Sequence, residues 1–376
     1  MQKIKTAIIG CGKVAHLHAA ALQNIQESDF NAVWSRTHSR AEEFAAKYKV
    51  KAYHDVEEMI SDAGIEAVLI CTAHPFHAEP AIKAMALGAH VLVEKPLASS
   101  LQDCDAMLET ARKSKVKFNM ISQRRFYKPC QRIRSAIDQG KIGKPILGTT
   151  TVYGWRDKDY YDSDPWRGSW QDEGGGVMVN QASHQLDLLQ WYMGEIDELY
   201  GYWDNFNHPY IEVEDTALAV IRFKNGALGN IILSNSQNPA LYGKVSIHGS
   251  NGASIGVQTE GGQMAIAGVP TISTPPLNDI WTIAGEENNL DKWEKEDSAF
   301  FKNIDPMQYY IQLQIQDFIQ AIIEDREAKV TAEEGRKTVE IFSAIYRSQR
   351  DGKAIKFPLQ PEKDRNDFDG RIINDH

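Results

Sequence analysis

The 376-residue chain is poor in cysteine, in positive charge and in long apolar runs, and each shortage argues against a class of protein. Its four cysteines are scattered without a C-x-x-C pair, so their spacing suggests neither a zinc site nor a disulfide framework. The 41 basic and 51 acidic residues give a net charge of -10, which argues against a nucleic acid as the main partner. No run reaches the roughly 18 apolar residues of a membrane span, and the N-terminus lacks an apolar signal core. We therefore expect a cytoplasmic protein with a small-molecule ligand, without a membrane partner and without a metal.

The length and a change of pattern along the chain predict two domains. Up to residue 123, short β-rich runs alternate with helical patterns, as in βαβ units around a parallel sheet. Farther on, Asn225-Gly226 and Asn251-Gly252 are typical of hairpins in an antiparallel sheet. We expect an α/β Rossmann domain over residues 1–123, an α+β domain with a large, mostly antiparallel open sheet over 124–357, and a C-terminal arm over 358–376.

The periodicity of apolar residues places the individual elements. In the first domain we expect strands at 5–9, 30–34, 66–71, 90–93 and 117–121, and helices at 14–25, 39–48 and 101–114. In the second domain we expect helices at 128–139, 179–193, 307–324 and 332–350, and hairpin strands at 215–223, 227–234, 244–248 and 253–257. The segment 285–305 is charged and has no period, which predicts a long loop.

A glycine-rich turn follows the first predicted strand. Gly10-Cys11-Gly12-Lys13-Val14-Ala15 gives the pattern G-x-G-x-x-A between a strand and a helix, the context in which it binds dinucleotides. Gly10 permits the tight turn, Gly12 leaves room for a pyrophosphate, and Ala15 lets helix and strand pack closely. Because the free N–H groups of a helix N-terminus bind phosphate, Gly10, Gly12, Lys13, Val14 and Ala15 are the first candidate cofactor residues. A glycine turn without a ligand is the alternative for a lone match.

The residues after the second predicted strand bear on the choice of cofactor. An acidic residue there would bond the ribose 2′-hydroxyl of NAD and repel a 2′-phosphate, and none is present. Ser35 and Arg36 instead offer a hydroxyl and a guanidinium that can hold a phosphate. The pair favours NADP over NAD; the alternative is that Arg36 only stacks on adenine.

Three further motifs resemble the Gfo/Idh/MocA oxidoreductases, named for glucose-fructose oxidoreductase and inositol dehydrogenase, and the resemblance covers nearly the whole chain. Residues 71–77 (CTAHPFH) look like the family's T-P-N-x-x-H segment, with Ala73 and His74 in place of Pro and Asn. Residues 88–97 (GAHVLVEKPL) are similar to G-K-H-V-x-x-E-K-P. Residues 174–187 contain three glycines and end in H-x-x-D. The resemblance implies further cofactor contacts from Thr72, His74, His77, Glu94 and Lys95.

The resemblance also implies the two catalytic residues, because in the family the Lys of E-K-P and the later His line the substrate site beside the nicotinamide. These are Lys95 and His184. A histidine with an ordinary pKa of about 6.5 suits removal of a hydroxyl proton. A lysine can stabilise the oxygen that gains negative charge, or share the proton as acid or base if its pKa is lowered. The function implied is NAD(P)-dependent hydride transfer at a secondary hydroxyl of a sugar, a glycoside or an inositol-like polyol.

The surroundings of His184 depart from part of the family. On a helix, Asn180, Ser183, His184 and Asp187 would lie along one face and form a single stripe of substrate contacts. Many relatives that act on inositols have Asp where this chain has Asn180, so proton relay through this position is open to question. Asn180 can still bond a substrate hydroxyl. Asp187 either orients His184 or has a capping or surface role.

Two regions rich in aromatic residues and arginines are candidate substrate walls. Arg125 lies at the predicted domain junction, where doubly wound folds bind ligands. Tyr153, Trp155, Arg156 and Trp166 follow in the second domain, and aromatic faces with arginines suit the recognition of a sugar ring. Packing in the core or at a subunit interface is the alternative for each aromatic residue.

Two other functions are compatible with these motifs. Some proteins that resemble the family are redox-neutral, NAD-dependent glycosidases, and relatives lacking the Lys or the His can be non-catalytic dinucleotide sensors. The presence of both Lys95 and His184 argues against the sensor. By analogy with the family we expect a homodimer or homotetramer.

Overall fold

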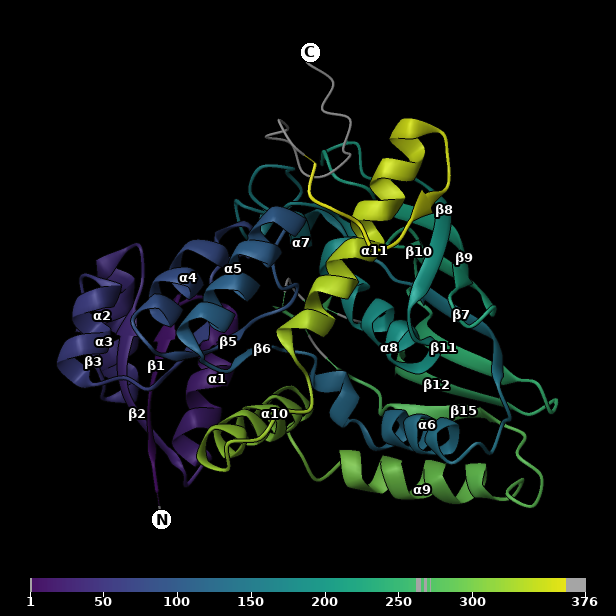
Figure 1. The fold of residues 1–376 in the computed structure, drawn as a ribbon, viewed down its shortest axis with the longest axis horizontal. Helices are drawn as coiled ribbons and strands as arrows, with labels where there is room; N and C mark the ends of the chain where they lie inside the picture. The colour runs from purple at the N-terminus through teal and green to yellow at the C-terminus, as the bar shows by residue number, and fades with distance from the viewer. Residues whose placement is uncertain (1, 262–264, 267–268, 271, 363–376) are drawn as a thin grey trace. The chain divides into compact units, whose positions relative to one another are not determined.

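The computed structural model describes residues 2–261, 265–266, 269–270 and 272–362, and the chain forms two compact units. The first unit comprises residues 1–123 and 307–336, and the second comprises 124–306 and 337–376. Figure 1 labels most helices and strands of both units.

The first unit is built on a six-stranded, wholly parallel sheet, in the order β3-β2-β1-β4-β5-β6. The strands are β1 Ile4–Ile9, β2 Ser28–Trp34, β3 Lys51–Tyr53, β4 Ala67–Ile70, β5 His90–Val93 and β6 Phe118–Met120. The helices are α1 Lys13–Asn24, α2 His38–Tyr48, α3 Val56–Ala63, α4 Ala78–Ala86, α5 Leu101–Ser114 and α10 Pro306–Ile323. This strand order is that of dinucleotide-binding folds, in which the order reverses between β1 and β4. The predicted Rossmann architecture is confirmed, and β3, α3 and α4 are additional to the expected elements.

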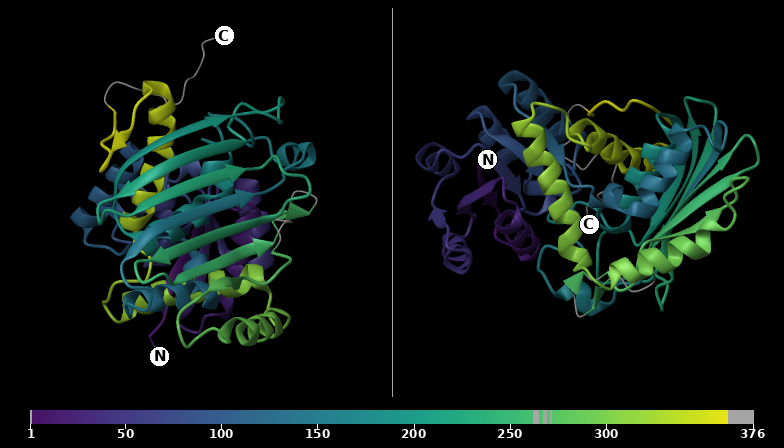
Figure 2. Two further views of the ribbon diagram at one scale, coloured as in Figure 1. Left: turned by 90° about the vertical axis from the view of Figure 1, so that its right-hand side faces the viewer. Right: turned by 90° about the horizontal axis from the view of Figure 1, so that it is seen from below.

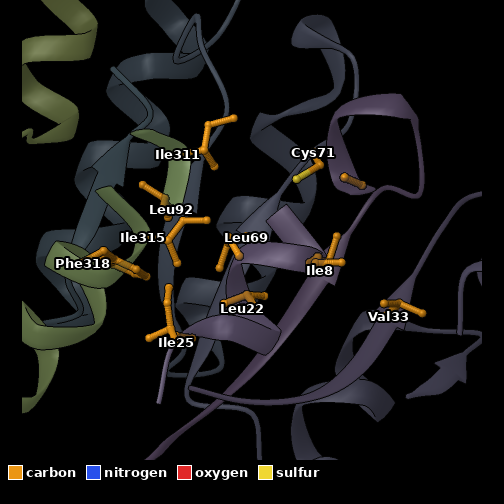
Figure 3. Close-up of a cluster of buried hydrophobic side chains, with 14 of the residues drawn as sticks. Ile8, Leu22, Ile25, Val33, Leu69, Cys71, Leu92, Ile311, Ile315 and Phe318 are labelled. Atoms are coloured by element: carbon orange, nitrogen blue, oxygen red, sulfur yellow. The ribbon is translucent and has the colours of Figure 1, made fainter. Parts of the chain in front are cut away.

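Helix α10 explains why the first unit contains a segment from late in the chain. Its Ile311, Ile315 and Phe318 are buried in one cluster with Leu22 of α1 and Leu69 of β4 (Figure 3). The expected division placed 307–336 in the second domain, whereas the structure groups these residues with the first unit. The helix itself agrees with the expected 307–324, but apolar periodicity does not reveal which core a helix faces.

The second unit contains an eight-stranded sheet in the order β15-β12-β11-β7-β10-β9-β8-β16. Its strands are β7 Pro145–Tyr153, β8 Ile196–Asp204, β9 Thr216–Phe223, β10 Leu228–Ser234, β11 Tyr242–Gly249, β12 Ser254–Gly261, β15 Leu277–Trp281 and β16 Ile355–Lys356, and β13 Ala265–Ile266 pairs separately with β14 Val269–Pro270. The helices are α6 Lys128–Asp138, α7 Lys158–Asp162, α8 Ser183–Met193, α9 Asn289–Phe301 and α11 Ala332–Asp351, and the boundary between the units falls within α11. Every described pairing in the large sheet is antiparallel except β7 with β10, so the predicted mostly antiparallel sheet is confirmed.

The two faces of the large sheet differ in their covering. Burial alternates along β9, as expected for a strand with one buried face. Helix α8 packs on the buried side, against β7 and β11. The opposite face exposes the large apolar side chains of Tyr202, Leu218, Val220 and Leu228, and Figure 2 shows this face without a covering helix among the described residues.

One expected element is wrong. The segment 285–305, expected as a loop, contains helix α9. Only Asp297 of α9 is buried, and the helix is held by its ion pair with Arg132 and by the contact of Trp293 with Trp281. Such a helix has no apolar stripe that would reveal it in the sequence.

The expected helix from residue 179 begins later. Residues Val177–Gln181 form a π-helical turn, in which the N–H of Ala182 donates to the carbonyl oxygen of Val177, and α8 starts at Ser183. Of the expected stripe, Ser183, His184 and Asp187 therefore share one α-helix, whereas Asn180 belongs to the wider turn before it.

The beginning of the expected C-terminal arm packs within its own unit. Leu359 is buried, and Glu362 forms an ion pair with Arg350 of α11. Residues 363–376 of the expected arm lie outside the described residues.

Candidate functional site

The glycine turn after β1 has the shape that a bound pyrophosphate requires. Gly10 has a φ of +97°, and a Cβ there would lie 2.7 Å from the backbone of Cys71, so only glycine fits. A Cβ at Gly12 would meet nothing within 4 Å, so space remains beside the first turn of α1. That turn contains no acidic residue, and Ala15 is fully buried beneath it. The N-terminus of α1 therefore faces a space that a phosphate can enter.

The other predicted cofactor residues of the first unit lie at the carboxyl ends of three strands of the parallel sheet. Ser35 and Arg36 follow β2, Thr72 and His74 follow β4, and Glu94 follows β5. The carboxyl ends of parallel strands meet at one edge of the sheet, which is where such folds bind ligands. The structure thus gathers these residues beside Gly10.

Arg36 is exposed, and its guanidinium carbon lies 5.1 Å from the centre of the Phe76 ring. Ser35 beside it is half-buried. Neither residue forms an ion pair in the described part of the chain. The hydroxyl and the guanidinium therefore remain available to a ligand.

His77 joins two of the predicted motifs. It is fully buried, and its ring nitrogens lie 3.0 Å from the carbonyl oxygen of Thr72 and 3.0 Å from that of Pro96. Burial lowers the pKa of His77, which favours the neutral ring. The ring connects the segment after β4 to the residue that follows Lys95. Its contacts are those of a positioning residue, whereas the sequence predicted a contact with the cofactor.

Glu94 has a partner that the sequence did not indicate. Its Oε1 lies 2.6 Å from Nε2 of His18 on α1, and its Oε2 accepts a hydrogen bond of 3.0 Å from the backbone N–H of Lys95. Burial by itself raises the pKa of Glu94, but the His18 bond and the neighbouring Lys95 charge bring it below its ordinary value. His18 lies three residues after Ala15 on the buried side of α1, so in the sequence it resembled a core residue.

In the second unit, the π-helical turn directs Asn180 to a carboxylate. The Nδ2 of Asn180 donates to Oε1 of Glu173, and Oε2 of Glu173 accepts a bond of 2.6 Å from the backbone N–H of Gly168. Glycine at 176 makes this path possible, because a Cβ there would meet the carbonyl oxygen of Glu214 at 1.9 Å. A carboxylate therefore lies next to Asn180. Its only signal in the sequence was an acid placed directly before three glycines.

The carboxyl of Glu173 titrates near neutrality. Complete burial raises its pKa from the ordinary 4.5 to about 7, against the opposing effects of the Gly168 N–H, Asn180 and Arg167. The buried Glu214 nearby raises it further. The site therefore contains a carboxyl group that binds or releases a proton at physiological pH.

Replacing Glu173 with Gln is expected to stabilise the protein at high pH only. Between pH 4.5 and about 7 the folded state keeps a proton that the unfolded state has lost, so the wild-type free energy of unfolding falls as pH rises, by up to about 3 kcal/mol. The glutamine removes this dependence. Chemical denaturation across that range should show that the free energy of unfolding of the variant, relative to that of the wild type, increases with rising pH. Asp159→Asn, at an exposed site, serves as the control. A constant difference at every pH would contradict the assignment.

Tyr160 connects Asn180 to two arginines. Its hydroxyl oxygen lies 3.2 Å from Nδ2 of Asn180 and 3.2 Å from Nε2 of Gln181, both of which donate to it. The guanidinium carbon of Arg167 lies 4.2 Å from the centre of its ring, and that of Arg156 lies 5.0 Å away. Arg156, Tyr160, Arg167, Asn180 and Glu173 thus form one contiguous group, here called the Tyr160 cluster, beside the turn that leads to His184.

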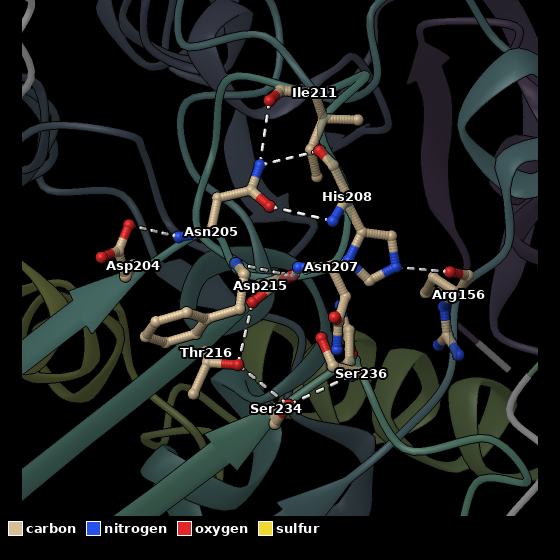
Figure 4. A network of polar contacts seen from close by, with 12 residues as sticks. Arg156, Asp204, Asn205, Asn207, His208, Ile211, Asp215, Thr216, Ser234 and Ser236 are labelled. Carbon is tan, nitrogen blue, oxygen red and sulfur yellow. Dashed lines mark hydrogen bonds and ion pairs between the residues drawn. The ribbon is translucent and has the colours of Figure 1, made fainter.

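The backbone of Arg156 is fixed by a buried histidine. Nε2 of His208 donates to the carbonyl oxygen of Arg156 over 2.7 Å, and its Nδ1 lies 2.8 Å from Oδ2 of Asp215 (Figure 4). His208 and Asp215 are completely buried. Since the rings of Trp155 and Tyr161 each lie 5.6 Å from His208, this histidine organises the aromatic side chains around the arginine.

The remaining predicted substrate residues have separate surroundings. Tyr153 ends β7 and packs against Tyr242, while Trp166 lies under the guanidinium of Arg167. Arg125 and Asp187 are both buried, and Nε and Nη2 of Arg125 donate to the two carboxylate oxygens of Asp187 over 2.8 and 2.6 Å. Nε and Nη2 of Arg125 are thus both bonded within the protein. Asp187, one of whose expected roles was to orient His184, has both oxygens bonded to the arginine.

His184 is the second residue of α8 and is buried, and Lys95 lies half-buried after β5. The two predicted catalytic residues belong to different units of the chain. Among the described residues, no helix is long and apolar enough to cross a membrane. The same residues contain no group of three or more side chains with metal-ligating chemistry.

Comparison with known proteins identifies the same family in both halves. The sequence family described as "Oxidoreductase family, NAD-binding Rossmann fold" (GFO_IDH_MocA) matches residues 4–122, and its "C-terminal alpha/beta domain" matches residues 134–357. The myo-inositol 2-dehydrogenase of Thermotoga maritima is 32% identical over 258 residues, which are 66% of this chain and 74% of that protein. The scyllo-inositol 2-dehydrogenase (NAD(+)) of Bacillus subtilis is 28% identical over 62% of this chain and 68% of its own length.

A solved structure agrees with this result. The WlbA dehydrogenase from Bordetella pertussis, in complex with NADH and UDP-GlcNAcA, matches with a TM-score of 0.83 and 26% identity, over 96% of this chain and 99% of that one. The match extends through both units of the fold.

Proposed function

Because the chain belongs to the Gfo/Idh/MocA family of NAD-binding oxidoreductases, we propose that it transfers hydride between a nicotinamide dinucleotide and a secondary hydroxyl of a sugar or cyclic polyol. The observation that carries the proposal is the glycine turn, where Gly10 permits the close turn and the space beside Gly12 admits a pyrophosphate. The similarity to two inositol dehydrogenases supports the substrate class. The bound nicotinamide would supply the hydride acceptor or donor.

We assign the proton chemistry to Lys95 and His184. When a secondary alcohol is oxidised, its carbon loses a hydride and its oxygen loses a proton. His184 takes that proton as the general base, a role in which histidine side chains commonly act. Lys95 donates a hydrogen bond to the same oxygen and stabilises its growing negative charge. His77 and Glu94 hold the backbone around Lys95 in place. His77 bonds the carbonyl of Pro96, and Glu94 accepts a bond from the N–H of Lys95.

A spectrophotometric screen tests the function. The protein is mixed with NAD or NADP and with a panel of inositols, aldoses, glycosides, sugar acids and sugar nucleotides, and the reduced nicotinamide is followed by its absorbance. Reduction of the cofactor by at least one cyclic polyol or sugar, lost in Lys95→Met, is the expected result. Binding of the dinucleotide without turnover of any member would contradict the proposal.

For the cofactor we propose a preference for NADP. The support is the exposed Arg36, the hydroxyl of Ser35 and the absence of an acidic residue directly after β2. Some relatives point the other way, since one is named for NAD(+) and one solved relative contains NADH.

Replacing Ser35 with Asp is expected to reverse the preference. A carboxylate at this position would repel the 2′-phosphate and accept a bond from the 2′-hydroxyl, so NADP should bind roughly tenfold more weakly and NAD more tightly. Titration of both cofactors by fluorescence measures the change, with Ser35→Asn as the uncharged control. Tighter binding of NAD to the unmodified protein would overturn the interpretation of Ser35 and Arg36.

We also propose that the chain forms a homodimer or homotetramer through the uncovered face of the large sheet. Its exposed Tyr202, Leu218, Val220 and Leu228 lie on the neighbouring strands β8, β9 and β10. Large apolar side chains gathered on one face are typical of a surface that another subunit covers. Light scattering measures the molecular mass in solution. The wild type should have the mass of a dimer or tetramer, and Val220→Lys a lower mass. A wild type of monomeric mass would contradict the proposal.

A further inference from the structure

Arg156 carries a buried positive charge without a counter-charge. Its relative exposure is 6%, and no carboxylate lies within ion-pair distance of it in the described part of the chain. The structure describes three other buried arginines, and each of them faces a carboxylate: Arg124 faces Glu260, Arg125 faces Asp187 and Arg347 faces Glu362. Because a buried charge is costly unless it is paired, Arg156 is the exception that calls for a partner.

The unpaired part of Arg156 is one particular edge. Its Nη1 donates over 2.8 Å to the carbonyl oxygen of Trp155, whereas Nε and Nη2 have no hydrogen-bond partner among the described residues. Figure 4 shows the backbone of Arg156 beside His208, which bonds its carbonyl oxygen. Arg125 uses the same edge, Nε with Nη2, to hold both oxygens of Asp187. A guanidinium edge of this kind matches a carboxylate or a phosphate with two parallel bonds.

The surroundings hold this edge in place and connect it to the candidate site. His208, itself bonded to Asp215, fixes the backbone of Arg156, and the Tyr160 ring packs against the guanidinium. Tyr160 accepts from Asn180, on the turn before His184. The other arginine on this ring, Arg167, already has a carboxylate partner in Asp164, at 3.3 Å. Arg156 is therefore the arginine of the Tyr160 cluster whose charge remains to be matched.

We propose that the substrate is an anionic sugar or polyol, and that Arg156 binds its carboxylate or phosphate through its guanidinium group. This rests on the proposed function and narrows its substrate class from polyols in general to those with an oxyanion group. The bond to the oxyanion orients the ring, and oxidation at the hydroxyl proceeds as for a neutral sugar.

The test measures binding and turnover separately, with D-glucose, D-glucuronate and D-glucose 6-phosphate as probes. Calorimetry in the presence of the cofactor should show tighter binding of at least one anionic probe than of glucose. Arg156→Gln should weaken that binding roughly tenfold to a hundredfold and leave the binding of glucose unchanged, since it removes the positive charge and its charge-assisted bonding to the oxyanion. Arg156→Lys keeps the charge and the contact with Tyr160 but loses the planar guanidinium. Its affinity for the anionic probe should therefore lie between those of the wild type and Arg156→Gln. Lys158→Gln removes an exposed charge from the same segment and should change nothing.

The outcomes separate the two proposals. Glucose binding as tightly as both anions, or an equal effect of Arg156→Gln on all three probes, overturns the role of Arg156. Turnover of neutral sugars alone also overturns the role of Arg156 but supports the dehydrogenase function. Binding of an anion that depends on Arg156, without turnover by either cofactor, supports the anion site and contradicts the dehydrogenase. A preference between glucuronate and glucose 6-phosphate identifies the source of the oxyanion.

Discussion

Replacing Lys95 with Met is expected to lower kcat by roughly a thousandfold while the affinity for the nicotinamide cofactor stays near that of the wild type. Methionine keeps most of the length of the side chain but removes the ammonium group. The lost hydrogen bond forms to an oxygen whose negative charge develops during the reaction, so its removal affects the rate of the chemical step more than binding. Steady-state kinetics with the substrate found in the screen, combined with cofactor titration, measures both quantities.

The structure explains why cofactor binding should survive this change. The loop of Lys95 is held by its backbone, through the bond from its N–H to Glu94 and the contact of His77 with the carbonyl of Pro96. Neither bond involves the lysine side chain. Lys83→Met, which breaks an ion pair with Asp55 on the same unit, is the matched control and should leave kcat unchanged. Unchanged turnover in Lys95→Met would remove this residue from the mechanism.

The parts of the fold that could be predicted from the sequence are those set by local chemistry. The glycine turn at 10–15 could be predicted because its pattern lies within six consecutive residues, with Gly10 at the tight turn and the small, buried Ala15 beneath it. The hairpin of β9 and β10 was predicted in the same way, from Asn225-Gly226 between two alternating segments.

The parts that could not be predicted depend on residues far apart in the chain. The carboxylate of Glu94 meets His18, 76 residues earlier, and no pattern within α1 distinguishes that histidine from an ordinary core residue. The amide of Asn180 reaches Glu173 only because residues 177–181 form a π-helical turn, whereas the sequence favoured a continuous α-helix. Likewise, α10 shows an apolar face in the sequence, but only the structure shows that this face completes the core of the first unit.

The bond between Arg125 and Asp187 also joins residues far apart in the chain. Breaking it is expected to have a large effect on stability. Asp187→Asn is expected to lower the free energy of unfolding by about 3–5 kcal/mol. The Arg125 and Asp187 side chains retain only 4% and 2% of their exposure, and the guanidinium also stacks on Trp191 at 5.1 Å. Asparagine leaves the arginine charge buried without its counter-charge, which costs far more than a lost surface ion pair. Urea denaturation measures the difference, and Glu109→Gln, in an exposed pair with Lys113, should be neutral.

The double variant Arg125→Met with Asp187→Leu separates the cost of an unpaired charge from the value of the pair. Because apolar side chains of similar volume fill the same space without a desolvation penalty, the double variant should recover most of the stability that Asp187→Asn loses. The kinetics then distinguish the two roles considered for Asp187. If it acts by holding Arg125 and α8, the folded single variant keeps the wild-type dependence of kcat on pH. If Asp187 instead sets the protonation of His184, that profile shifts, and the assignment of Asp187 to the Arg125 pair alone would be wrong.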